Sequence, residues 1–185
     1  LHPGVSRHEV SCSVRPRSIY RAAGSPMHSI RLAGPWQLTP LARTRWSADG
    51  ESIEEAGELP EGGQTTVPSD WGQLLGDDFR GRVQMLRYFH KPTGLETGDR
   101  VEVTFLQVDA MATVSLNDQL LGSVPAGGDA ARFEITGLLE QMNCLQVNVE
   151  LPRLTSESAP LQRPPDHQQA GGILGEVRLE ITTQS

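Results

Sequence analysis

Apolar residues recur at every second position in several short segments of this chain, and this period constrains the fold more than any other feature. In the clearest case Val101, Val103 and Phe105 alternate with Glu102 and Thr104. A β-strand points successive side chains to opposite faces, so a period of two predicts a strand with one buried face. No long segment keeps the three-to-four-residue spacing of an amphipathic helix. The pattern therefore predicts an all-β fold.

Roughly eight short strands are expected, separated by turn residues, and this number is typical of a two-sheet sandwich with jelly-roll connections. The 19 glycines and 13 prolines suit a chain with many turns. Asn117-Asp118 predicts a two-residue hairpin turn, although Gly is more usual at its second position. The expected strands cover residues 30–38, 65–67, 83–89, 101–105, 112–116, 120–124, 133–135, 145–149 and 177–181.

The connecting segments carry predictions of their own. Residues 50–64 are acidic and Gly-rich, and residues 152–170 are rich in Pro, Ser and Gln, so both are predicted to be loops. Ser69 or Asp70 is expected to cap a short helical turn, and Thr136 to cap another.

The first 26 residues differ from the rest of the chain in charge. They carry four arginines and one acid, whereas the whole chain has a formal net charge of -7. We interpret residues 1–26 as an upstream extension before Met27, expect them to be poorly ordered, and place one domain over residues 27–185. A functional basic arm is the alternative interpretation.

The charge and hydropathy patterns argue against several classes of protein. The acidic balance does not suit a general nucleic-acid binder, and no apolar run approaches the ~20 residues that span a bilayer. No signal peptide is recognised, which favours the cytoplasm without fixing the compartment. The two cysteines, Cys12 and Cys144, are interpreted as free thiols. No cofactor is expected, and no dense run of oxygen ligands indicates the structural calcium that related sandwiches often hold.

Six segments follow one another in a recognisable order and spacing, namely Leu32–Trp36, Val67–Trp71, Phe79–Pro92, Val101–Gly122, Phe133–Val149 and Gly171–Leu179. Together they resemble the N-terminal sugar-binding domain of glycoside hydrolase family 2, over about residues 30–182. The chain departs from the family pattern at Asp118, where Gly is usual, near Gln84-Met85, where an aromatic is usual, and at Gly175, where Arg is usual.

The resemblance implies a galactose-binding-like jelly-roll and a carbohydrate-related role. Family 2 enzymes cut glycosidic bonds in a (β/α)8 barrel of about 250 residues, which this chain of 185 residues does not hold. We therefore predict a non-catalytic carbohydrate-binding or accessory domain, with carbohydrate and a glycosidase catalytic chain as partners. A protein-interaction module that has lost sugar binding is the alternative, and a glycosidase in its own right ranks last. The oligomeric state is left open.

Five residues are candidate ligand contacts. Asp166 lies six residues before Gly172, which resembles a family Asp that reaches the sugar from a loop, and a carboxylate can accept hydrogen bonds from adjacent hydroxyls. His167 could join that loop site, and Asp78 lies near a second sugar-facing loop. Trp46 and Trp71 could stack on sugar rings, although tryptophans in a sandwich more often fill the core. No catalytic residue or metal ligand is predicted.

Overall fold

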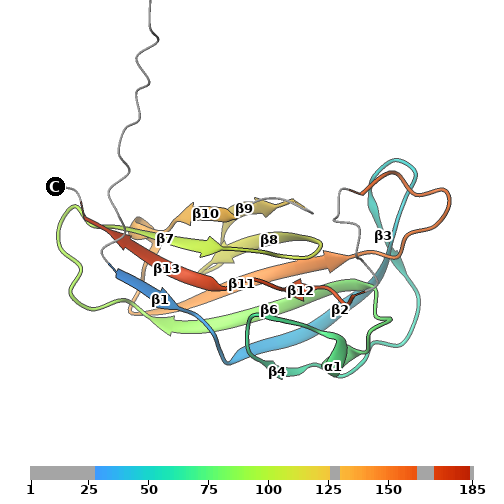
Figure 1. Cartoon of the computed structure of the whole chain (residues 1–185), viewed down its shortest axis with the longest axis horizontal. Helices are drawn as coiled ribbons and strands as arrows, with labels where there is room; N and C mark the ends of the chain where they lie inside the picture. The colour runs from blue at the N-terminus through green and yellow to red at the C-terminus, as the bar shows by residue number, and fades with distance from the viewer. Residues whose placement is uncertain (1–27, 126–129, 162–168, 184–185) are drawn as a thin grey trace, which may run out of the picture.

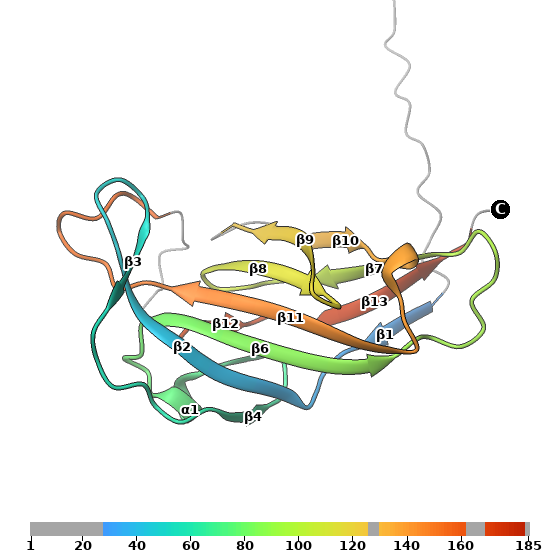
Figure 2. The same ribbon diagram turned by 180° about the vertical axis from the view of Figure 1, so that it is seen from behind.

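The computed structural model describes residues 28–125, 130–161 and 169–183, which form a sandwich of two main antiparallel sheets (Figures 1 and 2). The larger sheet has the strand order β3 (Ser52–Glu55), β2 (Trp36–Trp46), β6 (Gly81–His90), β11 (Met142–Leu151), β8 (Met111–Leu116) and β9 (Gln119–Val124), and β4 (Gly63–Thr65) also pairs with β2. The smaller sheet has the order β1 (His28–Arg31), β13 (Val177–Thr182), β7 (Arg100–Phe105) and β10 (Ala131–Glu134). The predicted all-β fold is confirmed.

Three short elements complete the described structure. β5 (Ser69–Asp70) pairs with β12 (Gly172–Ile173) apart from the two main sheets, and α1 (Gly72–Leu75) follows β5 directly. The 3-10 helix η1 (Thr136–Leu138) links β10 to β11. The described ends of the chain lie together, because His28 of β1 pairs with Ile181 of β13.

The core lies between the two sheets and follows the period of two. Val147 of β11 and Val103 of β7 are fully buried, and Leu179 of β13 is nearly so. In β11 the buried positions alternate with half-buried ones along the whole strand. The central strands β6, β8 and β11 therefore offer one apolar face to the core and one largely polar face to solvent.

Two predicted segments fold differently from the expectation. The single strand expected over residues 30–38 is two strands, β1 and β2, which lie in different sheets on either side of Gly34-Pro35. The loop expected over residues 50–64 contains β3 and β4. The acidic residues of β3 find basic partners, since Glu54 pairs with Arg82 and Glu55 with Arg153. β3 is held by its backbone pairing with β2 and has no run of alternating buried apolar residues, which is why the sequence pattern did not indicate it.

The turn predictions are borne out in part. Asn117 and Asp118 have φ values of 49° and 64°, so the hairpin between β8 and β9 takes the predicted form with two positive φ angles. The expectation that Ser69 or Asp70 is the N-cap of the first helical turn is wrong, because α1 begins after Trp71, which makes no side-chain cap. The Asp70 side chain does accept a hydrogen bond from the Gly72 N–H at 2.9 Å, one residue before that cap position. The expectation that Thr136 caps a turn is wrong, because its hydroxyl accepts the N–H of Val101 at 2.9 Å and so ties η1 to β7.

Candidate functional site

Trp71, one of the predicted ligand contacts, lies in the core beside α1. Its side chain is fully buried, and its ring meets Phe79 edge to face with the centroids 6.0 Å apart. A Cβ atom on Gly171 would lie only 2.5 Å from the indole, so the chain needs glycine at that position. The buried indole contributes packing, which is the commoner role of tryptophan in a sandwich.

Trp46 and Asp78 lie closer to solvent. Trp46 ends β2 and is half-buried, and its carbonyl accepts a hydrogen bond from the Ser158 hydroxyl at 2.6 Å. Asp78 is exposed in the turn between α1 and β6. The role of Trp46, Trp71 and Asp78 as sugar contacts stays a prediction.

Asp166 and His167 lie outside the described residues, but the segments on either side of them are placed. On one side the Ala159 N–H donates to the Ser47 carbonyl at 2.8 Å, beside Trp46. On the other side the Trp71 N–H donates to the Gly171 carbonyl at 3.0 Å. The predicted loop therefore begins next to one of the two tryptophans and ends next to the other.

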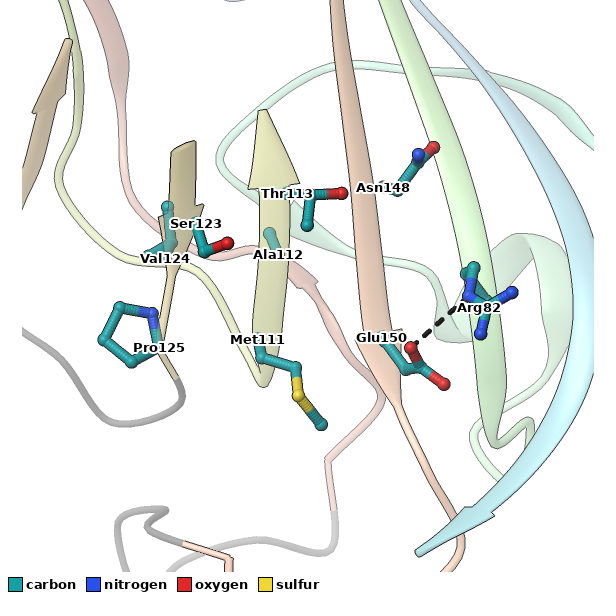
Figure 3. A pocket seen from close by; sticks show the side chains of 9 residues that line it. All are labelled: Arg82, Met111, Ala112, Thr113, Ser123, Val124, Pro125, Asn148 and Glu150. Atoms are coloured by element: carbon teal, nitrogen blue, oxygen red, sulfur yellow. Dashed lines mark hydrogen bonds and ion pairs between the residues drawn. The ribbon is translucent and has the colours of Figure 1, made fainter. Parts of the chain in front are cut away.

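A second candidate site, not predicted from the sequence, lies on the outer face of the larger sheet. It is a hollow of about 560 Å³ over β6, β11, β8 and β9 (Figure 3). The strand register aligns uncharged polar side chains in one row, because Asn148 pairs with Gln84 on one side and with Thr113 on the other, and Thr113 pairs with Ser123. The lining residues are Arg82, Met111, Ala112, Thr113, Ser123, Val124, Pro125, Asn148 and Glu150.

Ion pairs hold one end of this hollow in place. The Arg82 Nε lies 3.3 Å from Glu150, and its Nη1 lies 3.1 Å from Glu54 (Figure 3 shows the Glu150 pair). The Ser52 hydroxyl donates to the other oxygen of Glu150. Two carboxylates thus face one guanidinium, and the end of the hollow carries a net negative charge.

One polar atom of a residue that lines the hollow lacks a hydrogen-bond partner among the described residues. The side-chain oxygen of Asn148 is buried and accepts no hydrogen bond there. A buried polar atom without a partner costs free energy, so a ligand or a water that donates to it would be favoured. The neighbouring hydroxyls of Thr113 and Ser123 can both donate and accept.

A smaller hollow of about 270 Å³ lies where β4, β2 and β6 meet, and its lining includes Gln37, Gln64, Arg87 and Tyr88. The Arg87 Nη1 donates to the Pro35 carbonyl at 3.3 Å, and burial lowers the pKa of Arg87. The pKa of Tyr88 is raised, mainly by a hydrogen bond with the Cys144 thiol.

The lining of the larger hollow holds a single carboxylate. Among its nine lining residues the only acid is Glu150, whereas glycoside hydrolysis uses two carboxylates about 5–9.5 Å apart. In the described residues no three His, Cys, Asp or Glu side chains gather as a metal site would require. The described helices are also too short and polar to cross a membrane.

Comparison with solved structures places this fold among glycosidases. An FMN-binding β-glucuronidase from Faecalibacterium prausnitzii L2-6 matches 84% of this chain at 25% identity, with a TM-score of 0.61. A Bifidobacterium dentium β-glucuronidase complexed with coumarin-3-O-glucuronide matches 85% at 23% identity and a TM-score of 0.63. A GH2 β-galacturonidase from Eisenbergiella tayi bound to glycerol matches 83% at 21% identity and a TM-score of 0.59. The fold of this chain is similar to a β-sandwich region of these glycosidases.

The match covers one part of much longer proteins. The chain spans 22%, 30% and 24% of the three glycosidases, respectively. No known protein-family profile matches the sequence, and no curated protein matches it. The predicted all-β jelly-roll fold is confirmed, and the GH2-like domain agrees with the resemblance in the sequence.

Proposed function

We propose that this chain is a non-catalytic carbohydrate-binding or accessory domain of the family 2 type. One observation carries the proposal: the chain shares its β-sandwich with glucuronidases and a galacturonidase over more than four fifths of its length, yet spans less than a third of theirs. Where such a domain serves an enzyme, the bond-breaking residues lie on another domain or on another chain. The partners of the domain are then a carbohydrate and a glycosidase catalytic chain.

The local chemistry of the domain supports this role. The larger hollow offers amide and hydroxyl groups, which are the groups that hydrogen-bond to sugar hydroxyls. The loop between residues 152 and 170, which carries Asp166 and His167, is anchored beside Trp46 at its start. The larger hollow provides polar groups next to apolar surface, as ligand sites on proteins commonly do.

Calorimetric titration tests the proposal. The full chain is titrated with neutral and acidic mono- and oligosaccharides at millimolar concentration, and glycerol serves as a hydroxyl-bearing control that is not a sugar. We expect saturable heat for at least one saccharide and none for glycerol. Silence across the whole saccharide panel would refute carbohydrate binding.

A protein-interaction module is the second candidate, and one surface feature favours it. Tyr88 of β6 and Met142 of β11 are 55% and 49% exposed, and they lie near one another at one end of the larger sheet. Light scattering after size-exclusion chromatography would report a stable self-complex. If the chain is strictly monomeric, and Tyr88→Ser and Met142→Ser leave its mass in solution unchanged, these residues do not form a self-association surface.

A further inference from the structure

We propose that the larger hollow binds a neutral oligosaccharide, and that the sheet face rather than the loop end is the main sugar-binding surface of this domain. The inference rests on the proposed function and assigns its ligand class and place. It starts from the row of side chains that four neighbouring strands align, Gln84, Asn148, Thr113 and Ser123. None of them carries a charge.

This polar row differs from an ordinary solvated sheet face in one respect. On an open face each polar atom reaches water, whereas the Asn148 side-chain oxygen is buried and has no partner among the described residues. The hollow is nevertheless large enough, at about 560 Å³, for a small ligand. A turn of the Asn148 carboxamide toward the hollow would let its oxygen accept a hydrogen bond from a sugar hydroxyl.

The apolar part of the lining suits the remainder of a sugar ring. Met111, on β8, and Pro125, just after β9, lie together on one side of the polar row in Figure 3. A pyranose carries hydroxyls at its rim and C–H groups on its faces, so it needs both kinds of contact. Met adapts its shape to such a surface because its side chain is unbranched and flexible.

The charges at the end of the hollow favour a neutral sugar over a uronate. Arg82 is already paired with Glu54 and Glu150, so its charge is more than offset. A sugar carboxylate placed there would meet an excess of negative charge, which disfavours binding. The Glu150 carboxylate can instead accept hydrogen bonds from adjacent sugar hydroxyls.

The larger sheet is long enough for more than one sugar unit. The outward positions of β6 run from Arg82 at the larger hollow to Tyr88 at the smaller one, a distance of roughly 20 Å at 3.3 Å per residue. Longer saccharides should therefore bind more tightly than monosaccharides of the same type.

NMR titration of the labelled full chain tests this assignment. The probes are cellotetraose, xylotetraose and maltotetraose as neutral ligands, tetragalacturonate as the acidic one, and the corresponding monosaccharides. We expect a neutral tetrasaccharide to perturb amide signals of residues 111–113, 123–125 and 148–150, and to bind more tightly than its monosaccharide. Asn148→Ala should weaken this binding by about three- to tenfold, the loss expected for one hydrogen bond.

Ser29→Ala is the control variant. Ser29 is an exposed hydroxyl residue of β1 in the smaller sheet, outside the hollow, and its loss should leave the affinity unchanged. Perturbed signals around Trp46 and residues 71–80, with unchanged affinity in Asn148→Ala, would overturn the inference and leave the proposed function standing. Preferential binding of tetragalacturonate would overturn the assignment of a neutral ligand. The weakest binding of interest has a dissociation constant on the order of 10 mM. If no amide signal shifts at a saccharide concentration of about 10 mM, the inference and the proposed function are both rejected.

Discussion

The two faces of the larger sheet come from the same strands and differ in almost every physical respect. On β11 the inward residues Leu145 and Val147 are fully buried in the core, whereas their neighbours Gln146 and Asn148 point to the outer face. The inner face is held by apolar packing, which is worth about 25 cal/mol per Å² of buried surface. The outer face contributes little packing and is free to carry a binding surface. Stability and function are thus separated residue by residue along one strand.

Neighbouring substitutions on β11 give the largest expected contrast. Leu145→Ala should lower the free energy of unfolding by about 2–5 kcal/mol, because it leaves a cavity in a packed core. Gln146→Ala should change it by less than about 0.5 kcal/mol. Urea denaturation of both variants measures the difference. Equal losses would mean that β11 does not separate an inner from an outer face.

Two asparagines on β11 test whether polar groups, like apolar ones, contribute more to stability on the inner face of the sheet than on the outer face. Asn143 is fully buried, and its amide accepts the Glu140 N–H at 2.9 Å and donates to the Glu140 carbonyl at 2.8 Å. Asn143→Ala leaves these groups unsatisfied and should cost about 1–3 kcal/mol of unfolding free energy. Asn148→Ala removes an outward amide whose oxygen has no described partner, and should change stability by less than about 0.5 kcal/mol.

Chemical denaturation with the same two-state fit compares these asparagine variants. A loss in Asn148→Ala as large as that in Asn143→Ala would show that the outer amide has a structural role. That result would also remove the main argument for a ligand at its oxygen.

The sequence predicts the inner face much better than the outer one. Alternating Val, Leu and Phe in residues 101–105, 145–149 and 177–181 each correspond to a strand that the structure confirms. The signal is local, since every second residue within one segment must be apolar. β3 was not predicted, because the residues that form ion pairs with it, Arg82 and Arg153, are distant in the sequence.

The sequence predicts the candidate sites less well for the same reason. Asn148 and Thr113 are neighbours only because β11 and β8 pair in one register, and nothing local to either residue reveals that pairing. The one sequence signal for the larger hollow is that the outward positions 84, 113, 146 and 148 hold uncharged polar residues. Charged residues at these positions would keep the protein equally soluble. Trp71 is a further case, because a tryptophan that could stack on a sugar and one that fills the core look the same in the sequence, and its burial comes only from the fold.

The hairpin between β8 and β9 sharpens the comparison, because its turn sets which side chains face outward. A register slip of one residue would exchange the two faces of a strand. Asp118 has a φ of 64°, a conformation that glycine adopts at no steric cost. Asp118→Gly should therefore raise the free energy of unfolding by about 0.5 kcal/mol, and Asp118→Val should lower it by about 1–2 kcal/mol.

Thermal or urea unfolding measures both hairpin variants, and Asp78→Gly is the matched control. Asp78 is also an exposed turn acid, but it is not among the positive-φ residues of the described chain. Its replacement by Gly should be neutral or slightly destabilising, because glycine adds entropy to the unfolded chain. A gain in Asp78→Gly equal to that in Asp118→Gly would attribute the effect to charge rather than to backbone conformation.

The smallest expected effect on stability comes from Tyr88 and Cys144, which are cross-strand neighbours on the outer face of the larger sheet. The hydrogen bond with Cys144 raises the pKa of Tyr88 in the folded state. A raised folded-state pKa means that the contribution to stability is fully present below the unfolded pKa of about 10 and is lost as the pH rises through the folded-state value. Near neutral pH the free energy of unfolding should therefore not change with pH on account of Tyr88.

NMR titration of ¹³C-labelled tyrosine follows the ionisation of Tyr88 directly. Cys144→Ala should lower the pKa of Tyr88 towards its ordinary value, and Cys144→Ser, which keeps a hydroxyl partner, should lower it less. An unchanged pKa in Cys144→Ala would show that the thiol does not bond the phenol. Since Tyr88 also lines the smaller hollow, a sugar bound along the outer face should perturb its ring signal, whereas a sugar bound only at the loop end should not.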